Sequence, residues 1–222
     1  MQLDPAQMAP ADRYKMLIGT VVPRPIAFVS TISPDGRANV APYSFFNGVC
    51  GTPMTLLFCP SNKADGSEKD TLRNLLAGSA DGSGVGGQFV VNVASEPIIR
   101  QVVASAAELE YGESEFAFAG LTETRSARVR PPRVAESPMA FECEVTQIVR
   151  LAPGRPGGGN IVIGRVVLIH AKDGIVDERH HVNAAALAAV GRMAGVEYCT
   201  TRQRFHVPLG QAALESPDPL PR

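Results

Sequence analysis

Short apolar runs separated by turn residues dominate the pattern along the chain. Residues 26–32 combine β-branched and aromatic side chains, and residues 39–43 form a second such run. Between them, residues 33–36 read Ser-Pro-Asp-Gly, in which the proline presets φ and the glycine accepts a positive φ. The pattern therefore predicts a β-hairpin. Pro42 fits its second strand if that strand lies at a sheet edge, where the missing N–H faces away from the ladder.

The rest of the chain adds more strands than helices. Strands are predicted at residues 54–59, 88–93, 139–151 and 161–171. The first of these is continuously apolar, which indicates burial on both faces. Helices are predicted at 67–77, 96–109 and 184–190, while 10–18 fits either a short helix or an edge segment. Many strands joined by turns indicate a mainly β fold, an antiparallel barrel with helical additions. No GxGxxG opens a helix after a strand, so a Rossmann fold is not supported.

Three segments lack a regular pattern. Residues 78–87 are rich in glycine, and a strand rather than a helix follows them, so we interpret them as a flexible surface loop and not as a phosphate cradle. Residues 112–135 hold four arginines around a Pro-Pro pair and are expected to be irregular and extended. Residues 211–222 are expected to form a disordered tail, which leaves a single domain over residues 1–210.

Composition and charge exclude several classes of function. The 222 residues are 45% hydrophobic and 19% charged, with a formal net charge of -1. Such a chain has no basic field to hold nucleic acid or an anionic membrane. The first 17 residues carry charges and no apolar core, so they do not resemble a signal peptide. No apolar run is long enough to span a bilayer. The expected location is cytoplasmic.

The polar residues form no complete hydrolytic or metal-binding set. GxSxG and HExxH are absent, and the four cysteines, which contain no CxxC pair, are expected to be buried free thiols. His180 and His181 lie in a charged segment and are expected in a solvated loop rather than at a metal. Glu142 and Glu144 share one face of a predicted strand and are expected to face solvent.

Two segments are candidates for ligand binding. Ser67 or Asp70 can cap the helix at 67–77, and its start would present free N–H groups that suit a phosphate, with charge added by Lys63 or Lys69. Taken alone, this segment favours a well-capped surface helix that binds nothing. The stretch RANVAPYSFFNGV, residues 37–49, places small residues beside two phenylalanines. It is either the end of a core strand or a backbone against which a flat ligand lies.

Several runs in a fixed order resemble the flavin reductase-like, FMN-binding split-barrel family. They are PRPIAFVSTISPDGRANVAPYSFFNGV, KDTLRNL, FVVNV, PPRVAESPMAFECEV and IVIGRVVLIHAKDGIVDE. With a weaker likeness towards the C-terminus, they cover roughly residues 14–207. The resemblance implies a six-stranded antiparallel split β-barrel of the Greek-key type, a homodimer, and FMN bound near the dimer interface. The connector at 78–87 looks longer than the family's usual turn, and it is either a neutral surface insertion or a change in access to the site.

The resemblance also assigns residues to the cofactor site. The implied cofactor-binding residues are Arg24, Pro25, Ser30, Thr31, Asn39, Val40, Ala41, Pro42, Ser44, Phe45, Phe46, Lys69, Asp70, Thr71, Arg192 and Tyr198. Open main-chain N–H and C=O groups from Asn39 to Phe46 would hydrogen-bond the polar edge of the flavin ring. Lys69 and Thr71 would lie near the FMN phosphate, with Asp70 as the helix cap. His170 matches a histidine on the nicotinamide or substrate side, and a structural role is its alternative.

The implied function is that of an NAD(P)H:flavin oxidoreductase. NADH or NADPH would pass a hydride to FMN, and the electrons would reach a downstream acceptor such as a flavin-dependent monooxygenase. This step needs no acid or base, which fits the lack of a catalytic constellation. The same motifs also suit an FMN-binding electron-transfer protein that a protein partner reduces. A scaffold that has lost its flavin is disfavoured by the presence of Ser30, Ser44, Lys69 and Thr71.

Overall fold

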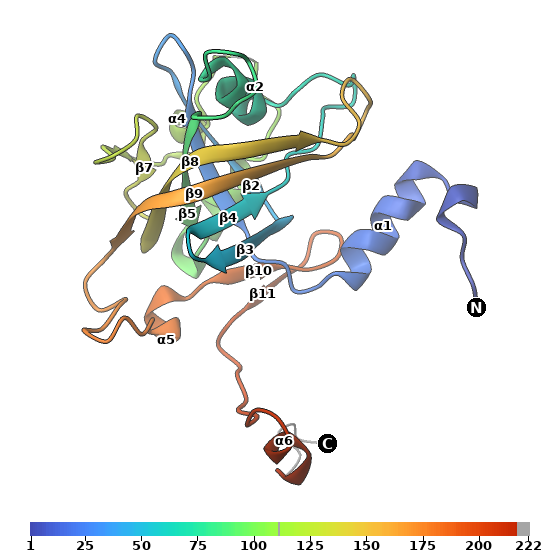
Figure 1. The fold of residues 1–222 in the computed structure, drawn as a ribbon, viewed down its shortest axis with the longest axis vertical. Coiled ribbons are helices and arrows are strands. Elements are labelled where there is room, and N and C mark those ends of the chain that lie inside the picture. Colours follow the sequence, from blue (N-terminus) through green and yellow to red (C-terminus); the bar gives the residue numbers. More distant parts are fainter. Residues whose placement is uncertain (111, 217–222) are drawn as a thin grey trace.

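A seven-stranded antiparallel sheet forms the centre of the protein, as the computed structural model of residues 1–110 and 112–216 shows (Figure 1). Its strands are β1 (Ala27–Ile32), β2 (Ala38–Tyr43), β3 (Phe46–Gly51), β4 (Met54–Phe58), β5 (Gln88–Val93), β8 (Met139–Arg150) and β9 (Asn160–Ala171). Their spatial order is β2-β1-β5-β8-β9-β4-β3. The mainly β, antiparallel architecture is confirmed. The described sheet has seven strands rather than six, because β3 adds to β4.

The predicted hairpin is present as β1 and β2, which pair from Ala27 opposite Tyr43 to Ile32 opposite Ala38. β2 lies at one edge of the sheet. The backbone N–H of Val40 donates to the Glu115 side chain and therefore points away from β1. Pro42 is two residues further along and has the same orientation, so its missing N–H removes no bond of the ladder.

The two edge strands of the sheet are neighbours in the sequence. β2 ends at Tyr43 and β3 begins at Phe46, although they stand at opposite ends of the strand order. The sheet must therefore curl until its edges meet at this corner. The curled sheet encloses an aromatic core, in which the Phe58 ring lies 5.2 Å from that of Tyr43 and 5.3 Å from that of Phe89. Burying each such ring stabilises the fold by about 1.5–3 kcal/mol.

Short helices and two small hairpins surround the sheet. The helices are α1 (Pro10–Thr20), α2 (Asp70–Ala77), α3 (Ile99–Ala104), α4 (Glu115–Ala119), α5 (Ala184–Leu187) and α6 (Ala212–Glu215), with 3-10 turns at Pro5–Gln7 and Glu96–Ile98. The hairpins are β6 (Glu123–Thr124) with β7 (Arg133–Val134), and β10 (Val190–Arg192) with β11 (Tyr198–Thr200). α2 packs on β1 and β2, and α4 packs on β2. A second core fills the space under α3 and α4, with Phe28 and Phe116 at its centre.

Several sequence-based expectations need correction. The helix predicted at 67–77 begins at Asp70, with Lys69 at the N-cap position, and no side chain caps it. Asp70 is therefore not the cap, and its carboxylate instead lies 3.6 Å from the ammonium of Lys63. The helix predicted at 96–109 is regular only to Ala104. Of the four free thiols, Cys143 is buried as expected, but Cys50 is exposed.

The connector and the histidine pair are mostly exposed, as expected for surface loops. The connector at 78–87 is mostly exposed and is fixed near its end, where the Gly86 N–H donates to the Val145 carbonyl. His180 and His181 are exposed, and no cluster of metal-ligating side chains occurs in residues 1–110 and 112–216. None of the helices described has the length and apolar character needed to cross a bilayer.

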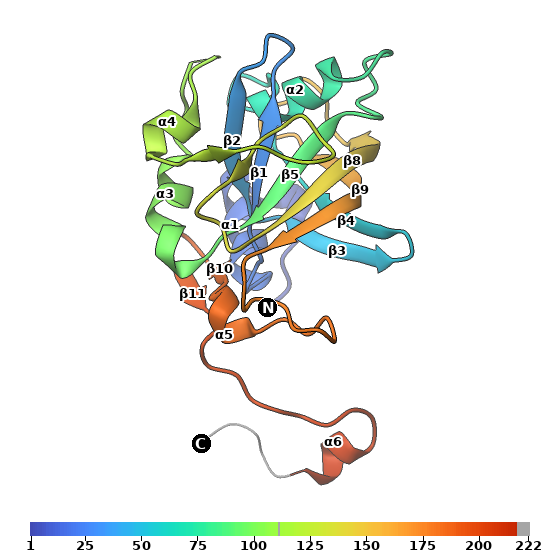
Figure 2. The same cartoon turned by 90° about the vertical axis from the view of Figure 1, so that its left-hand side faces the viewer.

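The two ends of the chain project away from the sheet (Figures 1 and 2). No residue of α1 is buried, and residues 201–216 run out as an extended arm that ends in α6. Both segments expose apolar side chains, namely Tyr14, Met16, Leu17, Phe205, Val207, Leu209 and Leu214. α6 gives a helical turn to part of the expected disordered tail, whereas residues 217–222 lie outside the described part of the chain.

Candidate functional site

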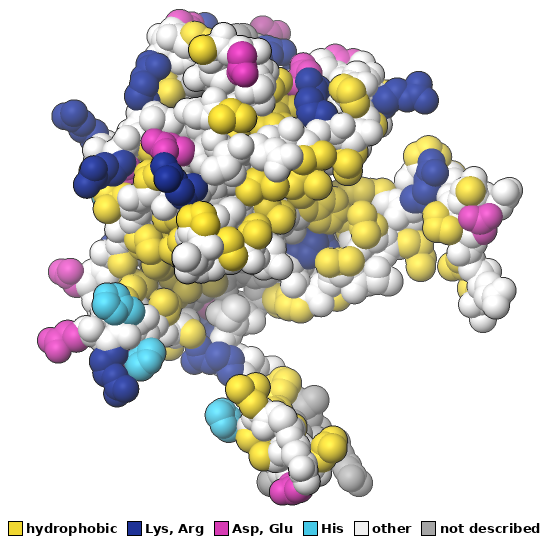
Figure 3. Space-filling model, in the orientation of Figure 1, with side chains coloured by type: hydrophobic (Ala, Val, Ile, Leu, Met, Phe, Trp, Pro, Cys, Tyr) yellow, Lys and Arg dark blue, Asp and Glu magenta, His cyan; other side chains and the backbone are white. Residues whose placement is uncertain are grey.

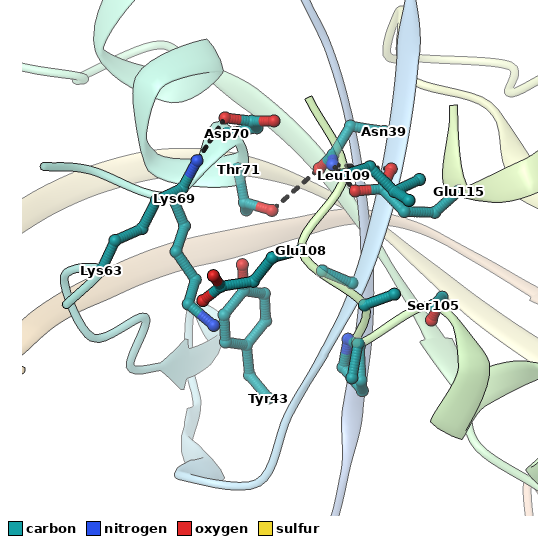
Figure 4. Close-up of a pocket in the computed structure, with 14 residues that line it drawn as sticks. Asn39, Tyr43, Lys63, Lys69, Asp70, Thr71, Ser105, Glu108, Leu109 and Glu115 are labelled. Atoms are coloured by element: carbon teal, nitrogen blue, oxygen red, sulfur yellow. Dashed lines mark hydrogen bonds and ion pairs between the residues drawn. The ribbon is translucent and has the colours of Figure 1, made fainter. Parts of the chain in front are cut away.

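Two hollows lie beside the corner where β2 passes into β3. The first, called here the polar pocket, has a volume of about 60 Å³ and is lined by Asn39, Ala41, Pro42, Tyr43, Lys63, Lys69, Asp70, Thr71, Ser105, Ala106, Ala107, Glu108, Leu109 and Glu115 (Figure 4). The second, the apolar cleft, has a volume of about 580 Å³, and its lining includes Arg24, Pro25, Ile26, Phe46, Val91, Phe141 and Val190. The first can hold one small polar group, and the second is large enough for an organic ring system.

A buried hydrogen-bond network forms the back of the polar pocket. The hydroxyl of Thr71 donates to Oδ1 of Asn39 at 2.9 Å, and the Thr31 hydroxyl donates to the same oxygen at 3.3 Å. The Asn74 amide donates to the Thr31 hydroxyl at 3.0 Å. The network ties the first turn of α2 to β1 and β2. The Thr71 proton is thus already in use, so this side chain shapes the pocket rather than offering a free donor.

Glu115 continues this network at the start of α4. Both of its carboxylate oxygens lie 2.9 Å from Nδ2 of Asn39, and one accepts the N–H of Val40 at 3.3 Å. Its exposed fraction is only 6%. Burial raises the pKa of Glu115, and the hydrogen bonds from Val40 and Asn39 offset only part of that effect. Glu115 therefore fixes the Asn39 amide. It also bonds the N–H of Val40, which is the N–H between residues 40 and 42 that points away from β1.

The front of the pocket carries positive charge and open donors. The first helical hydrogen bond of α2 runs from Arg73 to the Lys69 carbonyl, so the N–H groups of the three preceding residues have no intrahelical acceptor. Lys69 forms no ion pair within the described residues, and its side chain points toward Tyr43 and Glu108 (Figure 4). The buried Tyr43 hydroxyl lies beside Thr71 but has no partner of hydrogen-bonding geometry in the described chain, and burial raises its pKa.

These groups fit the phosphate of a flavin nucleotide. The ammonium of Lys63 lies 3.6 Å from the Asp70 carboxylate and offsets its negative charge. An anion in the pocket would meet Lys69, the open N–H groups at the start of α2 and the Tyr43 hydroxyl. The carboxylates that also line the pocket are those of Asp70, Glu108 and Glu115. A helix start with a nearby cation is a common arrangement for phosphate binding.

Arg24 organises the border of the apolar cleft. Its guanidinium donates to the carbonyls of Ile18 and Val21 at 2.6 and 2.7 Å, to the Met193 carbonyl at 2.9 Å and to the Ser44 hydroxyl at 3.2 Å. The Arg24 guanidinium also lies 5.9 Å from the centre of the Phe45 ring. Arg24 therefore joins the end of α1, β10 and the β2–β3 corner, and it acts as a structural clamp.

Arg192 and Tyr198 lie next to this clamp without lining either hollow. Backbone hydrogen bonds of 2.9 and 2.8 Å connect Arg24 and Arg192 in both directions. The Arg192 guanidinium lies 4.5 Å from the centre of the Tyr198 ring and donates to its hydroxyl. This pair stiffens the β10–β11 hairpin, which contributes Val190 and Thr200 to the wall of the cleft.

Other assigned residues lie elsewhere. Ser30 is fully buried and donates to the Pro132 carbonyl, outside both hollows. His170 is next to a different pocket of about 120 Å³, together with Arg133 and Lys172. The His170 ring contacts the Glu142 carboxylate. The structure therefore brings Lys69, Thr71, Asn39 and the β2 edge together but places His170 apart from them.

Glu142 and Glu115 were not recognised from the sequence. The expectation that Glu142 faces solvent is wrong: its exposed fraction is 0%, because residues 125–133 cover this part of β8. Glu115 gave no signal, because 76 positions separate it from Asn39 and a single acid at a helix start is common. Tyr43 belongs to the stretch singled out in the sequence, but nothing marked its hydroxyl.

Comparison with known proteins places the chain in a family. Residues 18–193 match the family described as "Flavin reductase like domain". An uncharacterized protein of Aquifex aeolicus is 37% identical over 83% of this chain and 88% of its own length. The crystal structure of nitrilotriacetate monooxygenase component B from Bacillus cereus is 31% identical, with a TM-score of 0.84 over 93% of this chain and 98% of the other. The 2-nitrobenzoate 2-nitroreductase NbaA of Pseudomonas fluorescens is 26% identical, with a TM-score of 0.82 over 95% and 97%. The chain belongs to the flavin reductase-like family, as its motifs predicted.

Proposed function

We propose that the protein is an NAD(P)H-dependent flavin oxidoreductase that binds FMN with the phosphate in the polar pocket. The proposal rests on the donors around that pocket: Lys69 and the Tyr43 hydroxyl, neither of which has a partner among the residues that the structure describes, and the open N–H groups of α2. When bound, FMN would accept a hydride from the nicotinamide and pass electrons to an acceptor. Two similar proteins are named as redox proteins: the Bacillus one as a monooxygenase component and the Pseudomonas one as a nitroreductase. Their names support an oxidoreductase function for this chain.

The edge of β2 would orient the ring. Glu115 occupies the N–H of Val40, and Pro42 has no N–H, so this part of the edge offers carbonyl oxygens and no donors. Outward carbonyls at Val40 and Pro42 suit a donor such as the imide N–H of a flavin. The earlier expectation of both donors and acceptors along this backbone is thus narrowed to acceptors between residues 40 and 42.

The chain is also proposed to work as a homodimer. α1 and the arm at 201–216 expose large apolar side chains while making few contacts with the sheet. The apolar cleft is open, and Figure 3 shows hydrophobic side chains gathered over the face from which α1 projects. A second copy would cover these surfaces and would exclude water from the site.

Replacing Lys69 tests the phosphate assignment. Lys69→Ala removes the unpaired cation, whose charge-assisted bond to a phosphate is worth about 1.5–3 kcal/mol. The Kd for FMN, measured by quenching of flavin fluorescence, should rise about 10- to 150-fold. Thr71 is left intact, because its hydroxyl holds Asn39 in place.

Arg179→Ala is the matched control, since it removes one positive charge from an exposed loop outside both hollows. Its Kd should equal that of the unaltered protein. Equal Kd values for Lys69→Ala and the control would refute the placement of the phosphate.

A further inference from the structure

The segment that joins β6 to β7 carries an unusual concentration of positive charge. Between Thr124 and Ala135 it contains four arginines and no acidic residue. We call residues 125–133 the arginine segment. Three of its arginines, Arg125, Arg128 and Arg130, are exposed. Dark blue side chains gather on the side of the molecule where β7 lies (Figures 1 and 3).

Within residues 1–110 and 112–216, the guanidinium groups of this segment differ from several other arginines in having no acidic partner. Elsewhere in the fold, arginines pair with carboxylates, as Arg150 does with Glu68 at 2.6 Å and Arg202 with Glu96 at 2.6 Å. No arginine of the segment forms such a pair within residues 1–110 and 112–216. Arg133 donates to a backbone carbonyl through one nitrogen, while its buried Nε has no partner in the described chain. The positive charge is therefore available to an outside partner.

A buried carboxylate holds the backbone of the segment from below. Glu142 accepts the N–H groups of Ala127, Arg128 and Val129 at 2.7, 2.6 and 3.1 Å, and it also contacts His170. Burial alone would raise the pKa of Glu142, but the hydrogen bonds from Ala127, His170 and Arg128 outweigh it and lower the pKa. A fully buried carboxylate is costly unless it is bonded in this way.

Three further hydrogen bonds fix the rest of the segment. The Ser126 hydroxyl donates to the Pro131 carbonyl at 2.6 Å, and the Ser30 hydroxyl donates to that of Pro132. The N–H of Arg130 donates to the Gln88 side chain at 2.9 Å. The exposed arginines thus project from a backbone without regular structure that is nevertheless held at many points. A partner that binds there would pay little for ordering this backbone.

We infer that the arginine segment is a docking surface for a carboxylate-rich surface of another protein. Arginine presents a planar fork that matches carboxylates in a bidentate way, and the segment contains four arginines and no lysine. A small nucleotide fits less well, because each neighbouring hollow is lined by a single arginine of the segment, Arg133 at about 120 Å³ and Arg130 at about 400 Å³, so neither gathers several of the arginines around a phosphate group. Nucleic acid fits less well too, because the chain carries a net charge of -1 and the segment holds no aromatic ring for base stacking.

The surface is separate from the proposed flavin site. No residue of the segment lines the polar pocket or the apolar cleft. The inference therefore does not depend on flavin binding, and it can fail or hold independently of the proposed function. For an oxidoreductase, such a surface would serve to hold an acidic protein that takes up its electrons.

Charge reversal in the full-length protein tests the inference, with fluorescently labelled poly-L-glutamate as the probe. The variant combines Arg125→Glu, Arg128→Glu and Arg130→Glu. The control combines Arg13→Glu, Arg155→Glu and Arg179→Glu, which are exposed and unpaired in the described chain and give the same change in net charge. Fluorescence anisotropy should show binding by the unaltered protein and the control, weakening as salt is added. The variant should bind about tenfold more weakly or worse.

The probe comparison decides between the possible occupants. Equal losses in the variant and the control would show that only net charge matters and would overturn the inference. Tighter binding of polyphosphate than of poly-L-glutamate through the same arginines would also overturn it, in favour of a phosphate ligand. A change in oligomeric mass confined to the charge-reversed variant would assign the surface to a second copy instead. Within the arginine segment, Glu142 bonds only to backbone N–H groups, so replacing the arginine side chains leaves these bonds intact. Circular dichroism should confirm that the variant folds.

Discussion

At the scale of single residues, two buried carboxylates hold backbone N–H groups that no neighbouring strand or helix bonds. Glu115 orients Asn39 and the edge of β2, and Glu142 holds the arginine segment. Each side chain bonds backbone N–H that no strand or helix partner bonds: Glu115 accepts that of Val40 at the outer edge of β2, and Glu142 accepts those of residues 127–129. This role is hard to read from sequence, because the partner of each acid is an N–H group that every residue type except proline carries.

Glu142→Gln tests this role through the pH dependence of stability. The folded-state pKa of Glu142 is lowered, so its contribution is fully present above its unfolded pKa of about 4.3 and is lost as pH falls through the folded pKa. At neutral pH the variant should lose about 2–4 kcal/mol, because its three backbone donors would face either a neutral amide oxygen, which is a weaker acceptor, or an NH2 group, which accepts nothing. Urea unfolding should show this difference shrinking as the pH is lowered below about 4.

Glu144→Gln is the natural control on the same strand. Glu144 is partly exposed and pairs with Arg165 at 2.9 Å, so its replacement should cost less than about 1 kcal/mol. Similar losses in the two variants would contradict the view that Glu142 anchors the segment. The two glutamates look alike in the sequence. They differ in burial, because residues 125–133 pack over Glu142 and leave Glu144 partly exposed.

At the scale of elements, the sequence-based prediction succeeded where the signal was local. The β1–β2 hairpin follows from its own turn residues, and the strands β5, β8 and β9 follow from their apolar content. β3 was missed because Asn47 to Gly51 are exposed and pair with only one strand, so no apolar pattern marks them. The length of the helix predicted at 96–109 was overestimated, because helical propensity alone does not show where tertiary contacts end a helix.

Gly164 illustrates how the elements fit together in the curled sheet. A Cβ at Gly164 would lie 2.4 Å from the Phe89 ring, so only glycine lets β9 pass this part of the core. Gly164→Ala should therefore lower the free energy of unfolding by about 1–3 kcal/mol through overpacking. Thermal or urea denaturation would measure the change.

Gly48→Ala provides the comparison within the same sheet. A Cβ at Gly48 meets nothing within 4 Å, and the residue is exposed on β3. Its replacement should be neutral or slightly stabilising, because alanine loses less backbone entropy on folding. If Gly164→Ala were as harmless as Gly48→Ala, the close packing of Phe89 against β9 would be wrong.

At the scale of the whole molecule, the projecting ends predict assembly. We expect light scattering to give twice the chain mass of 23.5 kDa for the full-length protein. Removing residues 205–222 deletes the exposed Phe205, Leu209 and Leu214 and should shift the protein towards the monomer. The shortened chain should keep its circular dichroism spectrum, because no residue of either core cluster is deleted. A monomeric full-length protein that still binds FMN would refute the homodimer.

The candidate site itself was only partly predictable. The motif around Asn39–Phe46 and the lysine at the start of α2 come together at the polar pocket, and their role in binding a cofactor stays a prediction. The resemblance could not show that Thr71 and Thr31 are turned inward, that Arg24 is a structural clamp, or that His170 contacts Glu142 instead. Such details depend on which neighbour each side chain meets, and contacts across many positions of the sequence decide that.

The most direct test of the proposed function is an anaerobic absorption spectrum of the purified protein with FMN, recorded before and after addition of NADH or NADPH. We expect the flavin band to bleach with one of the two donors, and faster than free FMN does under the same conditions. A bound flavin that stays oxidised with both donors, yet bleaches with dithionite, would contradict an NAD(P)H-dependent reductase. That result would favour an electron-transfer protein that is reduced by a protein partner.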